Sequence, residues 1–116
     1  MEITLHNVTF DCADADKLAR FWSQLLGRPL DDGANTEIAS IGISAPTPPR
    51  LVFVQVPEAK QVKNRVHVDL VATDLAAAVE RALDLGAARL GDHADGGYQW
   101  TTLTDPEGNE FDIVAA

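Results

Sequence analysis

Two stretches of this chain run through the same order of signals: an alternating apolar segment, a helical apolar stripe, a glycine and then further short apolar segments. The stripe of the first stretch ends at Leu26-Gly27, and that of the second ends at Leu85-Gly86. A unit that recurs in this way folds twice into a similar module, and 116 residues leave room for one domain of two modules. We expect these modules over residues 1–57 and 64–116.

A strand is predicted to open each module. Val8, Phe10 and Cys12 alternate with polar residues in the first module, and the segment 66–72 alternates in the same way in the second. Such a strand buries one face and leaves the other face polar. Cys12 shares the apolar face, so we expect its thiol to be buried and unreactive.

A helix is predicted to follow each opening strand, over about 15–26 in the first module and around the apolar stripe 75–83 in the second. Gly27 and Gly86 supply the positive-φ position that ends a helix. Short polar residues can cap both helix starts: Asp14 or Asp16 in the first module, and Thr73 or Asp74 in the second.

Short strands are expected after each glycine, which makes each module roughly βαβββ. Their ranges are 37–43 and 50–56 in the first module, and 99–104 and 110–114 in the second. The proline-rich break 44–49 is a loop, and the turn 105–109 joins the last two strands. The stretch 91–97 reads as a flexible polar loop, so we expect its His93 to be exposed and without a role.

The composition excludes several kinds of partner. A net charge of −9 opposes the phosphate backbone of nucleic acids, and no apolar run approaches the roughly 20 residues that span a bilayer. The single cysteine cannot form an internal disulfide, and the opening residues lack the pattern of a secretory signal. We therefore expect a cytoplasmic protein that binds neither nucleic acid nor membrane.

Polar residues recur on one face of the predicted sheet, opposite the face that the helices cover. They are Asn7, Thr9, Asp11, Gln55, His67, Asp69 and Asp112. This face meets solvent, or it lines a concave pocket for a small ligand if the strands curl together. Periodicity alone leaves both interpretations open.

Several motifs in this order make the chain resemble the vicinal oxygen chelate superfamily, which includes glyoxalases, bleomycin resistance proteins and dioxygenases, and in particular its glyoxalase-like domain branch. They are Asp11-Cys12-Ala13-Asp14, Phe21-Trp22, Leu26-Gly27, Val56-Pro57-Glu58-Ala59-Lys60, the run from Lys63 to Leu70, and the run from Asp105 to Phe111. The resemblance implies an α+β fold in which paired βαβββ modules form a curled, half-open mixed sheet around a cavity, with the helices outside. It also implies a homodimer.

In metal-using members of this superfamily, the first and last strands of each module supply ligands, usually His and Glu. His67 matches the histidine position of the second module, and Asp112 stands four residues after Gly108, where Glu is usual. In the first module the matching count falls on Val8, and Asn7 is the neighbour of the right polarity; His6 is one residue off and Gln55 is a weak ligand. The resemblance therefore leaves two alternatives, one divalent ion (Zn, Ni, Mn or Fe) or no cofactor.

Two functions follow from these alternatives. The first is the binding of a small, cationic or polar molecule without metal, in the manner of the bleomycin resistance proteins. Its candidate contacts are Asn7, Thr9, Phe53, Gln55, Asp69, Tyr98 and Trp100. Tyr98 and Trp100 could instead pack in the core, which is the favoured interpretation for Trp100. The alternative is a metal-dependent lyase, isomerase or dioxygenase that acts on a substrate with vicinal oxygens, with Asp69 or Glu110 as a candidate base.

Overall fold

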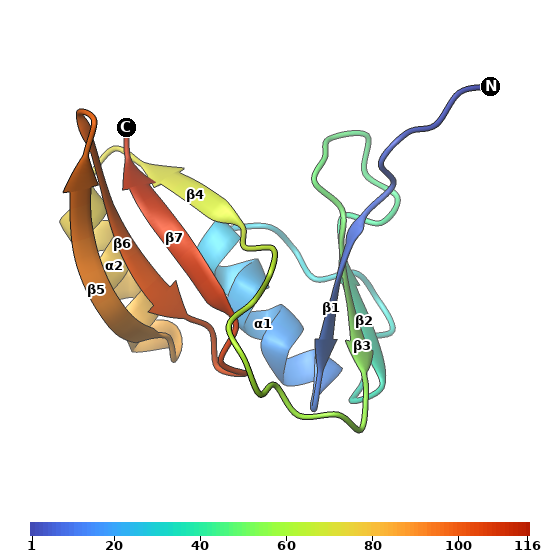
Figure 1. Cartoon of the computed structure of the whole chain (residues 1–116). Coiled ribbons are helices and arrows are strands. Elements are labelled where there is room, and N and C mark those ends of the chain that lie inside the picture. The colour runs from blue at the N-terminus through green and yellow to red at the C-terminus, as the bar shows by residue number, and fades with distance from the viewer. The chain divides into compact units, whose positions relative to one another are not determined.

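The computed structural model describes residues 1–116 and divides them into two units, Met1–Ala59 (unit 1) and Lys60–Ala116 (unit 2). Figure 1 labels their helices and strands. Unit 1 contains β1 (Val8–Cys12), α1 (Ala15–Leu26), β2 (Ile38–Ile41) and β3 (Leu51–Gln55). Unit 2 contains β4 (Asp69–Ala72), α2 (Leu75–Leu85), β5 (Ala88–Asp95), β6 (Tyr98–Thr104) and β7 (Glu110–Ala115).

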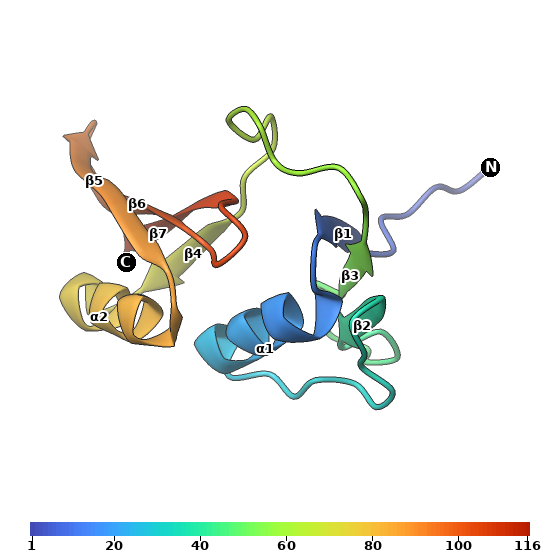
Figure 2. The same cartoon turned by 90° about the horizontal axis from the view of Figure 1, so that it is seen from below.

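Unit 1 is a three-stranded sheet in the order β1-β3-β2, with α1 on one of its faces (Figure 2). β1 and β3 are parallel, and β2 and β3 are antiparallel. The aromatic core lies between the sheet and α1: the ring of Phe10 stacks on Phe53 at 5.1 Å and lies 5.4 Å from the ring of Trp22. Trp22, on the apolar side of α1, is therefore a core residue.

Local signals account for the ends of α1. The Asp14 carboxylate accepts a 3.1 Å hydrogen bond from the N–H of Lys17 and caps the first turn. Gly27 ends the helix in the left-handed conformation, with φ of 64°, and its N–H donates to the carbonyl of Ser23. The range predicted for this helix is confirmed.

Unit 2 is a four-stranded sheet in the order β4-β7-β6-β5, in which only the β4–β7 pair is parallel. α2 lies on one face of this sheet (Figure 2), where Leu103, Phe111 and Ile113 are buried. The Asp74 carboxylate caps α2 by accepting a 3.0 Å hydrogen bond from the N–H of Ala77. Because side chains alternate along a strand, the neighbours of these core residues point to the other face, which we call the polar face of unit 2.

The α+β class of the resemblance is confirmed, with one mixed, open sheet and one helix in each unit. Unit 2 has the complete βαβββ order. In unit 1 the strand expected between α1 and β2 is reduced to a single bridge between Leu30 and Ile41. Neither helix is long and apolar enough to cross a membrane.

The interpretation of 91–97 as a flexible loop is wrong. Residues 88–95 form β5, which pairs with β6 and places His93 opposite Trp100. β5 is the edge strand of the sheet, and seven of its eight residues are exposed. An edge strand of this kind lacks the apolar alternation by which strands are recognised.

Candidate functional site

Three polar side chains form a row across the polar face of unit 2. Asp69 of β4 pairs with Asp112 of β7, and Asp112 pairs in turn with Thr102 of β6. Each alternates along its strand with residues that face α2, such as Ile113 and Leu103. The parallel β4–β7 pair thus brings together two carboxylates that lie more than 40 residues apart in the sequence.

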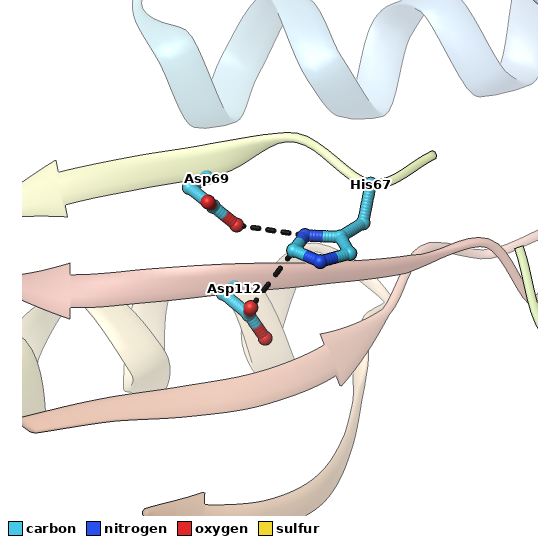
Figure 3. A group of neighbouring side chains, drawn as sticks. All are labelled: His67, Asp69 and Asp112. Atoms are coloured by element: carbon cyan, nitrogen blue, oxygen red, sulfur yellow. Dashed lines mark hydrogen bonds and ion pairs between the residues drawn. The ribbon is translucent and has the colours of Figure 1, made fainter. Parts of the chain in front are cut away.

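His67 completes this group from the chain that leads into β4 (Figure 3). Its Nδ1 lies 2.8 Å from Asp69 Oδ1 and 3.6 Å from Asp112 Oδ2. Because an ionised carboxylate only accepts, Nδ1–H is the donor to Asp69. We call His67, Asp69 and Asp112 the carboxylate–histidine cluster.

The members of this cluster differ in their exposure to solvent. The side chains of His67 and Asp69 are 40% and 54% exposed, whereas that of Asp112 is 17% exposed. Asp112 is also held by Thr102, whose hydroxyl donates a 2.6 Å hydrogen bond to Asp112 Oδ1. Asp112 is therefore the most buried member of the cluster, with Oδ1 bonded to Thr102 and Oδ2 toward His67.

A hollow of about 480 Å³ lies beside the cluster on the same unit. Its lining consists of Asp69, Asp95, Gly96, Tyr98, Trp100, Asp112 and Val114. The ring of His93 stacks on that of Trp100 at 5.3 Å with an interplanar angle of 27°. The hollow therefore combines carboxylates with an aromatic wall that a second ring supports.

The opposite end of the polar face carries an ion pair. Glu110 lies two residues before Asp112 on β7, and its carboxylate is 3.2 Å from Lys60 Nζ. The hydrogen bond from the Asn64 N–H lowers the pKa of Glu110 below its usual value, burial opposes this effect, and Lys60 adds to the lowering. A carboxylate that is held ionised and already paired is a poor proton acceptor, which makes Glu110 a weak candidate for a base.

The carboxylate–histidine cluster fits a divalent ion. Each member offers one ligand atom, and these atoms lie within 4.8 Å of one another. Zinc holds such atoms at about 2.0–2.2 Å, so donors that share an ion lie about 3 Å apart. His67 Nδ1 lies 2.8 and 3.6 Å from the two carboxylates, which is near this spacing, and Nδ1 would be a ligand in the tautomer whose proton is on Nε2. Three protein ligands are the usual number for a catalytic zinc.

Asn7 and Thr9 of unit 1 lie on one face, as the alternation predicts. Asn7 Nδ2 donates a 2.8 Å hydrogen bond to Thr9 Oγ1, and His6 Nδ1 lies 2.9 Å from Asn7 Oδ1. Cys12 is 4% exposed and its Sγ donates to the carbonyl of Val54, so the prediction of a buried thiol is confirmed.

The expected placement of Phe53 and Gln55 on the polar face is wrong. β3 pairs with β1 so that Phe53 is opposite Phe10 and Gln55 is opposite Cys12, on the side that faces α1. Phe53 is fully buried, and the Gln55 amide donates to the carbonyl of Ala13. The two side chains therefore contribute to the structure of unit 1 and offer no surface to a ligand on its polar side.

The alternation predicted His67, Asp69 and Asp112 on one face of the sheet, and these three side chains lie together in the structure. Tyr98 and Trp100, for which the sequence left stacking on a ligand or packing in the core open, line the hollow beside Asp69 and Asp112. Sequence reasoning missed Thr102, Asp95 and His93. Thr102 could have been found, because it shares the alternation of Trp100 along β6. Asp95 and His93 could not, because their strand carried no recognisable pattern.

The sequence matches the family described as Glyoxalase-like domain over residues 7–114. The chain belongs to the glyoxalase-like domain family. This match confirms the glyoxalase-like domain branch to which the predicted resemblance pointed. No curated protein matches the chain in sequence.

Three solved structures illustrate the similarity of this glyoxalase-like domain. A glyoxalase/bleomycin resistance protein/dioxygenase family enzyme from Burkholderia phytofirmans PsJN is 15% identical with a TM-score of 0.77, over 95% of this chain and 96% of the other. A mutant of the fosfomycin resistance protein FosX from Listeria monocytogenes is 13% identical with a TM-score of 0.79, over 100% and 92%. Lactoylglutathione lyase from Agrobacterium tumefaciens is 12% identical with a TM-score of 0.68, over 97% and 93%. At these identities the similarity establishes the fold of the glyoxalase-like domain.

Proposed function

We propose that this protein binds a small molecule on the polar face of unit 2, and that the molecule carries a positive charge next to an apolar group. The observation that carries the proposal is the composition of the hollow, in which three carboxylates lie beside Tyr98 and Trp100. A cation over an aromatic face gains about 0.5–2 kcal/mol, and nearby carboxylates add a Coulomb attraction. The hollow has the size of a site for a ligand of a few rings.

Binding of this kind needs no metal. In the cluster, the hydrogen bonds from Thr102 and His67 already satisfy one oxygen of each carboxylate. The remaining oxygens keep their negative charge and are accessible to an ammonium group. The net charge of −9 adds a general attraction for cations that decreases with salt.

Benzyltrimethylammonium is a suitable probe, compared with neutral benzyl alcohol and anionic benzoate. Tryptophan fluorescence reports the hollow, because Trp22 is 1% exposed and only Trp100 contacts it. We expect the cation to bind more tightly than the alcohol, and benzoate to bind least. Trp100→Phe should remove the fluorescence response.

Asp112→Asn and Asp69→Asn should each weaken the cation about fivefold, the equivalent of about 1 kcal/mol, and leave benzyl alcohol unchanged. Asp84→Asn is the matched control, because Asp84 is an exposed carboxylate on α2. Equal affinity for the cation and the alcohol, or equal losses in Asp84→Asn and Asp112→Asn, would contradict the proposal.

The second candidate is a divalent-metal-dependent lyase, isomerase or dioxygenase, and the carboxylate–histidine cluster favours it. His67 and Asp112 would be ligands, and Asp69 would supply a third from the same unit. When bound, the ion would act as a Lewis acid toward a substrate with vicinal oxygens. The FosX structure from Listeria monocytogenes contains Mn(II) and 1S,2S-dihydroxypropylphosphonic acid, which supports the comparison without giving the substrate here.

We also propose that the protein forms a homodimer. Both sheets are open, so the edge strands β1, β4 and β5 have unpaired backbone groups along one side within their own sheets. Proteins commonly cover such edges by association. Light scattering behind a sizing column should give a mass near 25 kDa, twice the 12.5 kDa of the chain, and a mass of one chain across micromolar concentrations would contradict the dimer.

A further inference from the structure

We infer that Glu110 is a positioning residue for His67, so that this carboxylate outside the carboxylate–histidine cluster sets the geometry of the proposed site. The inference adds to the proposed function, and the effect of Glu110 on ligand binding rests on that function. Glu110 lies at the first position of β7, two residues before Asp112 and on the same face. It contacts the segment 60–64, which opens unit 2 and leads toward His67.

Two bonds tie this segment to Glu110. Glu110 Oε1 accepts a 3.0 Å hydrogen bond from the N–H of Asn64 and lies 3.2 Å from Lys60 Nζ. Lys60 Nζ also donates to the carbonyl of Val62, so the lysine closes a small loop of backbone. The side chains of Lys60 and Glu110 are only 23% and 14% exposed, and water therefore weakens this pair less than it weakens an open surface pair.

A second anchor follows His67 in the sequence. The N–H of Asp112 donates a 3.1 Å hydrogen bond to the carbonyl of Val68. Asn64 and Val68 are thus both fixed to β7, one by the side chain of Glu110 and the other by the backbone of Asp112. Only the residues 65–67 lie between these anchors, and His67 is the last of them.

This double attachment explains how His67 keeps its place although it precedes β4 and has a side chain that is 40% exposed. Without the Glu110 carboxylate, the Asn64 N–H and the Lys60 ammonium would lose this partner, and the chain before His67 would be held less tightly. The imidazole would then sample positions in which Nδ1 is no longer between Asp69 and Asp112. Glu110 acts on the site through the backbone and makes no contact with the ligand.

The test uses the full chain labelled with ¹³C-histidine. The protein has three histidines, so its Cε1–H spectrum contains three signals, which the variants His6→Gln, His67→Gln and His93→Gln assign. In Glu110→Ala we expect the His67 signal to shift and broaden while the signals of His6 and His93 stay in place. Hydrogen exchange at the Asn64 amide should accelerate about tenfold, because its acceptor is lost.

Conservative variants separate the two bonds. Glu110→Gln keeps an oxygen for the Asn64 N–H, so the His67 signal should return to the wild-type position. Lys60→Met removes the ion pair but keeps the Asn64 bond, and it should move the His67 signal less than Glu110→Ala does. Glu80→Ala, which removes an exposed carboxylate from α2, is the control and should change none of the three signals.

An unchanged His67 signal in Glu110→Ala, or equal movement of all three histidine signals, would overturn the inference. Should Glu110→Ala fail to fold, Asn64→Pro removes the same hydrogen bond from the other side, and the same selective change at His67 is expected. These readouts need no ligand, so failure of benzyltrimethylammonium to bind would contradict the proposed function while leaving the role of Glu110 standing.

Discussion

Thr102 Oγ1 donates a 2.6 Å hydrogen bond to Asp112 Oδ1, and the other oxygen of the same carboxylate, Oδ2, lies 3.6 Å from His67 Nδ1. The threonine therefore occupies one oxygen and leaves the other for the histidine or for a bound cation. It also fixes the rotation of the carboxyl group, because Asp112 and Thr102 are paired across adjacent strands. A ligand that uses Oδ2 meets an oxygen whose direction is already set.

Thr102→Val should weaken cation binding at Asp112. The substitution keeps the β-branched shape of the strand residue but leaves Asp112 Oδ1 without its donor. We expect an affinity for benzyltrimethylammonium about threefold to tenfold lower, in line with about 1 kcal/mol for one hydrogen bond. Titration followed by Trp100 fluorescence measures the loss, and Thr102→Ser should recover most of the affinity. Equal affinities of the valine variant and the wild type would show that the hydroxyl does not order the carboxylate.

The metal alternative predicts about one divalent ion per chain in untagged protein after incubation with Mn, Fe(II), Ni or Zn. His67→Ala, Asp112→Ala and Asp69→Ala should each lose the ion, since two remaining ligands hold it poorly. His6→Ala should retain it, because His6 lies outside the cluster. Elemental analysis of dialysed samples gives the stoichiometry. Wild-type protein that remains free of metal under all four conditions would remove this alternative.

The lowered pKa of Glu110 predicts that its contribution to stability depends on pH. A carboxyl group whose folded-state pKa is depressed stabilises the fold above its unfolded pKa, near 4.3, and this contribution is lost as the pH falls through the folded-state value. Urea unfolding from pH 7 to pH 3 should therefore show wild type more stable than Glu110→Gln at neutral pH. The two should converge as the pH falls below the lowered folded-state pKa, where Glu110 becomes protonated. A difference that stays constant over this range would contradict the assignment.

Burial of Cys12 predicts slow reaction of its thiol. The side chain is 4% exposed and its Sγ donates to a backbone carbonyl, so a thiol reagent reaches it only when the fold opens. We expect native protein to react at least about a hundredfold more slowly with Ellman's reagent than protein unfolded in urea. Absorbance of the released thiolate measures both rates. Comparable rates in the two states would place Cys12 at the surface.

Features with a local cause could be predicted from the sequence. The range of α1 follows from the Asp14 cap, the apolar stripe and the left-handed Gly27, all of which lie within one short stretch. The turn before β7 follows from Asp105, whose carboxylate accepts hydrogen bonds from the N–H groups of Glu107 and Asn109. Repetition of such signals predicted two similar modules, and the complete βαβββ order of unit 2 agrees with that prediction.

Features that depend on strand register could not be predicted in the same way. Phe53 alternates with Val52 and Val54, which are also apolar, so its strand gives no local indication of which face is buried. The parallel pairing with β1 decides the question by placing Phe53 opposite Phe10. In β5 the difficulty is the opposite one, since the strand has too few apolar residues. It lies at the edge of its sheet and is exposed on both of its own faces, so its sequence has no apolar alternation to detect.

The sequence by itself determined the α+β class, the glycine-terminated helices, the buried thiol and the polar alternation that includes His67, Asp69 and Asp112. Each of these depends on residues close together in the chain or on a repeated pattern of polarity. The tertiary structure decided which of the polar residues meet: the β4–β7 pairing joins Asp69 to Asp112, the β6–β7 pairing adds Thr102, and Glu110 holds the segment that precedes His67. The contacts of Asp69 with Asp112 and of Glu110 with the segment before His67 join parts of the chain more than 30 residues apart. The contact of Thr102 with Asp112 depends on the register of the β6–β7 hairpin. Backbone pairing fixes these contacts only when the sheet forms.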